Sequence, residues 1–168
     1  LAAGEIPIYE PGLAELVETN RAAGRLAFTT DLAGAAAGAD AVFIAVGTPA
    51  RRGDGHADLS HVLGAAEEAA RHLDDGTVPV GTARRLAGLV AAARPGLDFE
   101  VAANPEFLRE GSAIEDFMRP DRVVVGADSA RAMETLRGLY RPLYLRETPI
   151  VETTPETAEL AKYAANAF

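Results

Sequence analysis

Cysteine is absent from the 168 residues of the sequence, and lysine occurs only once. Without a thiol, these residues can form no disulfide, no thiolate metal site and no cysteine nucleophile. The three histidines, His56, His61 and His72, have no spacing that suits a metal site. We interpret them as solvated surface side chains and expect no metal.

Basic residues are in the minority, and long apolar runs are missing. Sixteen Lys and Arg stand against 25 Asp and Glu, a net charge of -9 that argues against a nucleic acid polymer or an anionic membrane as partner. No stretch approaches the roughly 20 apolar residues of a membrane span. The N-terminus also lacks the basic start and apolar core of a signal peptide. The sequence therefore predicts a cytoplasmic protein without a membrane partner.

The single lysine, Lys162, is the only exception in an otherwise arginine-only set of cations. This exception suggests that the position needs an ammonium on a flexible stem, and not a planar guanidinium. Chance placement on an exposed helix face is the alternative, and composition does not separate the two. Asn166 follows four residues later, on the same face of a predicted helix, so the pair could hold an oxygen-rich ligand.

Short apolar runs alternate along the chain with amphipathic or alanine-rich segments. This alternation predicts a doubly wound, Rossmann-like α/β fold with a mostly parallel sheet, incomplete here and followed by the start of a long central helix. The expected strands are residues 26–29, 41–46, 99–103, 122–126 and 150–151. The expected helices are residues 13–24, 31–38, 58–73, 82–93, 128–142 (ended by Pro142) and 155–168.

Chemistry is expected at residues 104–111, which read Asn-Pro-Glu-Phe-Leu-Arg-Glu-Gly. They follow a predicted strand, and open α/β sheets bind their ligands at the carboxyl ends of their strands. A second candidate is Gly47-Thr48-Pro49 after the run 41–46, which is either a bare turn or the floor of a nucleotide site. Taken alone, the turn is the better interpretation.

Six motifs, in order over nearly the whole chain, resemble the UDP-glucose/GDP-mannose dehydrogenase family. They lie at residues 6–13, 45–49, 77–82, 104–111, 116–122 and 158–166. The variant of residues 104–111, followed by Pro-Asp-Arg, is most similar to members that act on UDP-glucose. The resemblance implies NAD-dependent oxidation of a sugar primary alcohol to a carboxylate in two steps, UDP-glucose to UDP-glucuronate, with a thiohemiacetal between them.

The resemblance also implies a role for each matching residue. Catalysis is expected of Glu106, as the base of the hydrolytic step, and of Lys162, Asn166 and Thr77. The NAD cofactor is expected to contact Val46, Gly47, Thr48, Pro49, Thr77 and Glu110. The nucleotide-sugar substrate is expected to contact Glu106, Phe107, Leu108, Arg109, Lys162 and Asn166. Residues 1–152 are then a partial NAD-binding domain, and residues 153–168 begin the central helix of the substrate and dimerisation domain of a homodimer.

The sequence departs from the family pattern at three places. The Gly-rich fingerprint expected before Leu1 and the catalytic cysteine expected after Phe168 are not in it, and an apolar strand is missing between Gly76 and Thr77. We therefore expect this chain alone to be inactive. The alternatives are a sibling enzyme acting on GDP-mannose or a UDP-N-acetyl sugar, and a non-catalytic NAD-binding remnant.

An apolar wall beside Glu106 is expected to raise its pKa toward the working pH, as general acid and base transfer favours. The competing interpretation of Glu106 and Glu110 is a solvated loop with an ion pair to Arg109.

Overall fold

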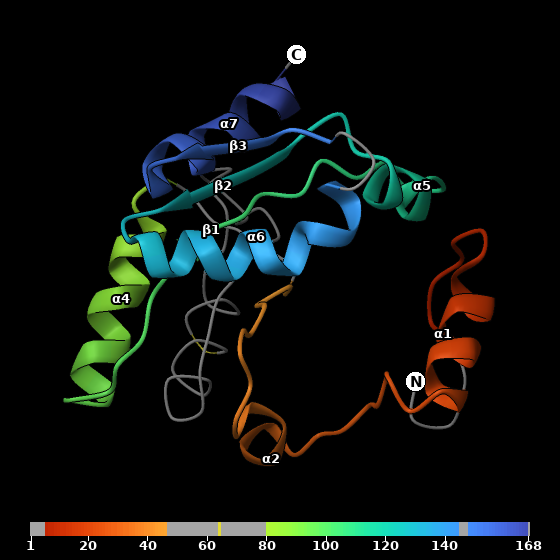
Figure 1. Ribbon diagram of the computed structural model, residues 1–168, viewed down its shortest axis with the longest axis horizontal. Helices are drawn as coiled ribbons and strands as arrows, with labels where there is room; N and C mark the ends of the chain where they lie inside the picture. Colours follow the sequence, from red (N-terminus) through yellow and green to blue (C-terminus); the bar gives the residue numbers. More distant parts are fainter. Residues whose placement is uncertain (1–5, 47–63, 65–79, 145–147, 168) are drawn as a thin grey trace, which may run out of the picture.

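The computed structural model describes residues 6–46, 64, 80–144 and 148–167, and Figure 1 shows how their elements are arranged. None of the helices formed by these residues is long and apolar enough to span a membrane. The elements, in order, are α1 (Leu13–Ala22), α2 (Leu32–Ala36), α4 (Thr82–Ala93), β1 (Ala102–Ala103), α5 (Ala113–Met118), β2 (Val123–Ala127), α6 (Ala130–Tyr144), β3 (Ile150–Thr153) and α7 (Pro155–Ala167).

The described strands form one sheet in the order β1-β2-β3. β2 pairs parallel to β3 and antiparallel to β1. The central strand β2 is a continuous apolar run because helices cover both of its faces. Val123 and Val125 pack with Leu136 of α6, while Val124 packs with Ala158 of α7. The period of two along β2 therefore places the sheet between α6 and α7 (Figure 1).

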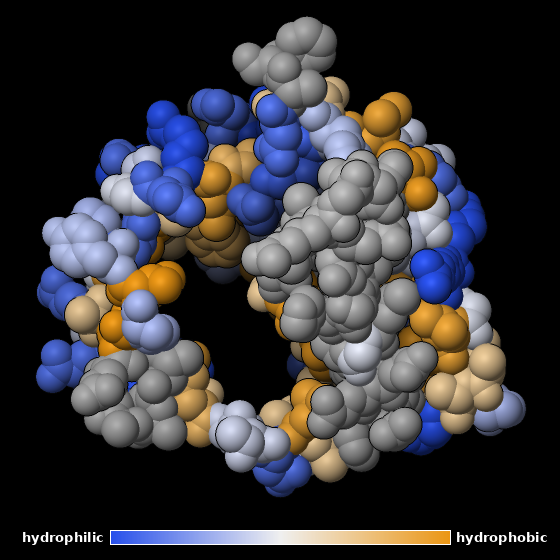
Figure 2. Space-filling model, turned by 180° about the vertical axis from the view of Figure 1, so that it is seen from behind, coloured by the Kyte–Doolittle hydropathy of each residue, from blue (hydrophilic) through white to orange (hydrophobic). Residues whose placement is uncertain are grey.

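Residues 6–46 form an arm that stands apart from the sheet (Figure 1). The arm touches the rest of the chain at both ends, through a hydrogen bond from Gly111 to Glu10 and through packing of Ile44 on Leu86. Between these contacts an opening separates the arm from the body of the molecule, as Figure 2 shows. The arm accordingly exposes apolar side chains, among them Tyr9 at 92% and Phe43 at 56%.

The Rossmann-like class is confirmed, but the strand predictions hold only in part. The strands at 122–126 and 150–151 are present, as β2 and the longer β3. The run 99–103 contributes only Ala102–Ala103, which pairs antiparallel to β2 and is an exception to the mostly parallel order expected of the sheet. Residues 26–29 are not a strand, and in the run 41–46 only Ile44 forms a β-bridge. An apolar run becomes a strand only where a neighbour supplies backbone partners, which composition does not reveal.

The helix predictions are confirmed at α4 and α7 and wrong at one boundary. Pro142 was expected to end its helix, yet α6 continues to Tyr144. The proline removes one backbone donor close to the end of the helix, where the last turn can lose one hydrogen bond. The short helix α5 was not predicted, although Ser112 at its N-cap and the first-turn acids Glu115 and Asp116 are typical of a helix start. The expected helix 58–73 lies outside the described residues apart from Gly64, which is helical.

Gly126 in β2 allows α7 to approach the sheet closely. A Cβ at this position would lie 2.4 Å from the Thr154 carbonyl oxygen and 2.7 Å from the Cβ of Ala158. We expect Gly126→Ala to lower the free energy of unfolding by about 1–3 kcal/mol, the usual cost of overpacking. Chemical denaturation of the purified wild-type and variant proteins measures this difference in the free energy of unfolding.

Gly138 in α6 supplies the matched control, because a Cβ there would meet nothing within 4 Å. Gly138→Ala should raise the stability by about 0.5–1 kcal/mol, since alanine loses less backbone entropy in a helix. Equal effects of the two substitutions would contradict the close contact at Gly126.

Candidate functional site

The loop of residues 104–111 leaves β1 and is fixed to the sheet at its first residue. The Asn104 amide nitrogen donates to the Val124 carbonyl oxygen at 2.9 Å. The hydroxyl of Tyr140, on α6, donates to the Asn104 side-chain oxygen. Burial raises the pKa of this hydroxyl, although its bond to Asn104 acts in the opposite direction, so Tyr140 stays a neutral donor. The loop therefore starts from a rigid point between β2 and α6.

The only lysine in the sequence reaches this loop from α7. Its Nζ atom donates to the Glu106 carboxylate at 2.7 Å and to the Glu106 carbonyl oxygen at 2.5 Å. The Lys162 side chain is 19% exposed, and its Nζ lies 5.6 Å from the centroid of the Phe107 ring. The Lys162 side chain is therefore mostly buried, and its ammonium is fixed by two oxygen partners and an aromatic ring. A cation on a solvated helix face would lack these partners.

The second carboxylate oxygen of Glu106 accepts the Leu108 N–H at 2.7 Å. Burial acts to raise the pKa of this carboxyl. The Lys162 hydrogen bond, the Leu108 N–H and the attraction of the ammonium outweigh burial, and the pKa lies below its ordinary value. The expectation of a raised pKa is therefore wrong in this structure, because the partner from α7 favours the charged form.

Arg109 pairs with Asp116 of α5, and not with Glu106 or Glu110 as the competing interpretation supposed. Its guanidinium donates to both carboxylate oxygens, at 2.6 and 3.1 Å, and its backbone N–H donates at 2.9 Å. The guanidinium hydrogen bond, followed by the backbone one, lowers the pKa of Asp116. This pair ties the loop to α5, which makes Asp116 a positioning residue that we did not single out from the sequence.

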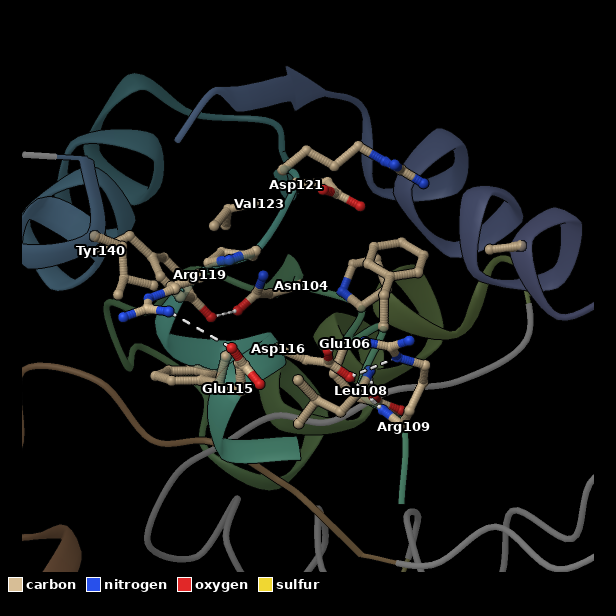
Figure 3. A pocket seen from close by; sticks show the side chains of 17 residues that line it. Asn104, Glu106, Leu108, Arg109, Glu115, Asp116, Arg119, Asp121, Val123 and Tyr140 are labelled. Atoms are coloured by element: carbon tan, nitrogen blue, oxygen red, sulfur yellow. Dashed lines mark hydrogen bonds and ion pairs between the residues drawn. The ribbon is translucent and has the colours of Figure 1, made fainter. Parts of the chain in front are cut away.

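A cavity of about 600 Å³ opens beside the loop, and Figure 3 shows its side chains. Four residues expected to contact the substrate line it together, namely Glu106, Phe107, Leu108 and Arg109. Arg122 lies across the cavity wall with its guanidinium carbon 5.2 Å from the centroid of the Phe107 ring. The rest of the lining is Asn104, Pro105, Glu115, Asp116, Phe117, Arg119, Pro120, Asp121, Arg122, Val123, Tyr140, Leu143 and Ala165.

Asn166 and the cofactor residues are less fully described. Asn166 lies one turn beyond Lys162 on α7 and is exposed, without a hydrogen bond to another described side chain. Val46 is 41% exposed and Glu110 is also exposed, and their contact with a cofactor stays a prediction. The remaining predicted cofactor residues, Gly47, Thr48, Pro49 and Thr77, lie outside the described residues.

Gly111, the last residue of the loop 104–111, is bonded to the arm of residues 6–46. Its N–H donates to a Glu10 carboxylate oxygen at 2.9 Å, and its φ of 81° is one that glycine adopts without strain. Glu10 is therefore a second positioning residue that we did not single out. Its place in the first motif, Ile-Pro-Ile-Tyr-Glu-Pro-Gly, was the available signal.

Comparisons with known proteins identify the family of this chain. The profile of the NAD binding domain of the UDP-glucose/GDP-mannose dehydrogenase family matches residues 1–144. Together with the sheet and its helices, the match defines a Rossmann-type, NAD-binding dehydrogenase domain. The chain belongs to the UDP-glucose/GDP-mannose dehydrogenase family.

Among curated relatives, a UDP-glucose 6-dehydrogenase of Rhizobium meliloti is 55% identical, over all of this chain and 40% of its own length. A UDP-glucose dehydrogenase structure from Pyrobaculum islandicum has a TM-score of 0.91 at 44% identity, covering 99% of this chain and 40% of that one. GDP-mannose dehydrogenase from Pseudomonas aeruginosa has a TM-score of 0.89 at 35% identity, with coverages of 99% and 40%. The chain thus spans about 40% of the length of each of these relatives.

Proposed function

We propose that this chain is the NAD-binding part of an enzyme that oxidises the primary alcohol of UDP-glucose to the carboxylate of UDP-glucuronate. The observation that carries the proposal is the contact between Lys162 Nζ and the Glu106 carboxylate at 2.7 Å, beside a cavity large enough for part of a nucleotide sugar. The 55% identity to a UDP-glucose 6-dehydrogenase supports this substrate.

Each group in the site has a task that its chemistry suits. When bound, NAD supplies the hydride acceptor. The ammonium of Lys162 faces the carboxylate and carbonyl oxygens of Glu106, and from this position it can stabilise negative charge developing on the sugar oxygen. The carboxylate of Glu106 carries a negative charge and can take a proton from the attacking water in the hydrolytic step. Asn166 orients the sugar from the same face of α7, and Thr77 contacts both cofactor and sugar.

The remaining loop residues bind the substrate, and others hold the cofactor. Phe107, Leu108 and Arg109 shape the sugar and pyrophosphate pocket, in agreement with their common place in the cavity wall. Glu110 and residues 46–49 line the cofactor site. Residues 1–152 form the NAD-binding portion, and residues 153–168 begin the helix that leads to the substrate domain. The exposed Leu160 and Tyr163 on α7 support dimerisation through this helix.

The test is NADH formation by the purified full-length protein with UDP-glucose, GDP-mannose and a UDP-N-acetyl sugar, compared by kcat/KM. Preference for UDP-glucose, with UDP-glucuronate as the isolated product, is the expected result. Preference for GDP-mannose would instead indicate a GDP-mannose dehydrogenase, the enzyme whose structure is 35% identical to this chain. Binding of NAD without oxidation of any of the three sugars would indicate a non-catalytic remnant.

A further inference from the structure

Glu159 on α7 has a buried carboxylate that binds the start of another helix. The residue is only 3% exposed. One carboxylate oxygen accepts the Gly81 N–H at 2.6 Å, and the other accepts the Ala83 N–H at 2.8 Å. These two amides belong to the N-cap and the first turn of α4. Both oxygens of Glu159 are therefore used to hold α4 against α7.

The electrostatics explain why a carboxylate can be buried at this place. The first amides of a helix have no partner within it, and the helix dipole places positive potential at the same end. The N-cap, Gly81, has no side chain to accept from these amides. Among the described residues, Glu159 forms no ion pair with a cationic side chain, and its two oxygens accept the amides at the start of α4. Its two short, charge-assisted hydrogen bonds are directional, which fixes the relative placement of the two helices.

The same turn of α7 carries the ammonium of the active site. Glu159 and Lys162 are three residues apart and therefore lie on neighbouring positions of one helix face. Lys162 reaches Glu106 from there, and Gly81 lies only four residues after Thr77 in the sequence. The rotation of α7 about its axis decides whether Lys162 faces Glu106. The bonds from Glu159 to α4 restrict this rotation, together with the packing of Ala158 on β2.

We propose that Glu159 is a positioning residue that aligns Lys162 for catalysis by fixing α7 to the N-terminus of α4. The inference rests on the proposed function, because it assigns Glu159 a part in that reaction. Glu159 is buried, and both of its carboxylate oxygens accept protein amides, so we assign it no direct contact with substrate or cofactor. Its effect should appear in the step that depends on the direction of the ammonium, more than in the binding of either substrate.

α7 contains a natural control three residues earlier. Glu156 also contacts α4, but its carboxylate forms an exposed ion pair with the Arg84 side chain, with the two side chains 36% and 55% exposed. Such surface pairs contribute little and do not fix a helix orientation. Glu156→Gln and Glu159→Gln therefore make the same chemical change on the same helix, at an exposed ion pair and at a buried double hydrogen bond.

The experiment compares Glu159→Gln, Glu159→Ala and Glu156→Gln in the full-length enzyme, at a temperature where circular dichroism shows each variant folded. Glu159→Gln keeps one acceptor oxygen but places an NH₂ group against the second amide. We expect its kcat to fall about tenfold to a hundredfold, the effect of a misplacement of roughly 1 Å. The KM values for NAD and the sugar should each change less than kcat, and Glu156→Gln should match the wild type. Hydrogen exchange at the Gly81 and Ala83 amides should be faster in Glu159→Gln.

The outcomes separate the inference from the proposed function. A wild-type enzyme without sugar oxidation contradicts the proposed function itself. An active wild type with equal kcat in Glu159→Gln overturns the positioning role alone. The positioning role is also overturned if a Glu159 variant loses activity only in proportion to its loss of folded protein, because Glu159 would then stabilise the fold and nothing more.

Discussion

Replacing Lys162 by methionine in the full-length enzyme should lower kcat by a factor on the order of 10²–10³, the usual loss when a donor to a developing oxyanion is removed. Methionine keeps most of the length and volume of the lysine stem, so packing near Phe107 changes little. What is lost is the ammonium, which donates to the Glu106 carboxylate and carbonyl oxygen. The KM for UDP-glucose should change much less than kcat, because the charge matters most in the transition state.

Two further variants make this result specific. Lys162→Arg keeps the positive charge but replaces a compact ammonium by a planar fork, so we expect it to recover only part of the activity. Arg85→Met removes an exposed cation from α4, outside the cavity lining, and should leave the kinetics unchanged. Steady-state NADH production measures all three. A Lys162→Met enzyme with wild-type kcat would show that Lys162 takes no part in the reaction.

Patterns that are local in sequence predicted much of the fold. The valine run of β2 is buried on both faces, and the N-terminal proline and first-turn acid of α7 are typical of a helix start. The helix expected at residues 82–93 likewise matches α4. In each case the residues that decide the element are neighbours along the chain. The antiparallel pairing of β1 with β2 was missed because pairing direction depends on how distant segments meet.

In the candidate site, too, the sequence indicated individual residues but not the contacts between residues that are far apart in the chain. The family resemblance, added to the rarity of lysine and the density of polar groups at residues 104–111, indicated Lys162 and Glu106, and the structure brings the two together. The residues that hold them in place were missed. Glu159 acts on Gly81 across 78 residues, and Glu10 acts on Gly111 across 101. No periodicity or spacing links positions so far apart, and only the folded chain shows their contacts.

The pKa of Glu106 is the clearest example of this limit. An apolar neighbour and a cationic neighbour shift a carboxyl pKa in opposite directions, and the sequence alone does not tell which one prevails. In the folded chain, burial acts to raise the pKa of Glu106. The hydrogen bonds from Lys162 and from the Leu108 N–H lower this pKa by more than burial raises it, so the net shift is downward. The carboxylate is therefore the form that prevails at neutral pH, which suits a base and not an acid.

Replacing Glu106 by glutamine should slow steady-state turnover about 10²–10⁴-fold, the usual contribution of a positioned base. Glutamine has nearly the same shape, and its amide oxygen can still accept from Lys162, so substrate binding and hydride transfer should continue. The hydrolytic step has then lost its base. Stopped-flow measurement should show a burst of NADH in proportion to the enzyme, followed by slow turnover. Glu134→Gln, an exposed acid of α6, is the matched control and should show no burst.

The pH dependence provides a second measurement on the same group. Since Lys162 lowers the pKa of Glu106, the wild-type enzyme should keep its base form down to a pH below the ordinary value of 4.5, within the range where it stays folded. Removal of the ammonium in Lys162→Met takes away part of this lowering, so the acidic limb of its activity profile should move to higher pH. In Glu106→Gln this limb should disappear from the hydrolytic step. An unchanged acidic limb in both variants would mean that another group is the base, and that Glu106 only holds Lys162 in place.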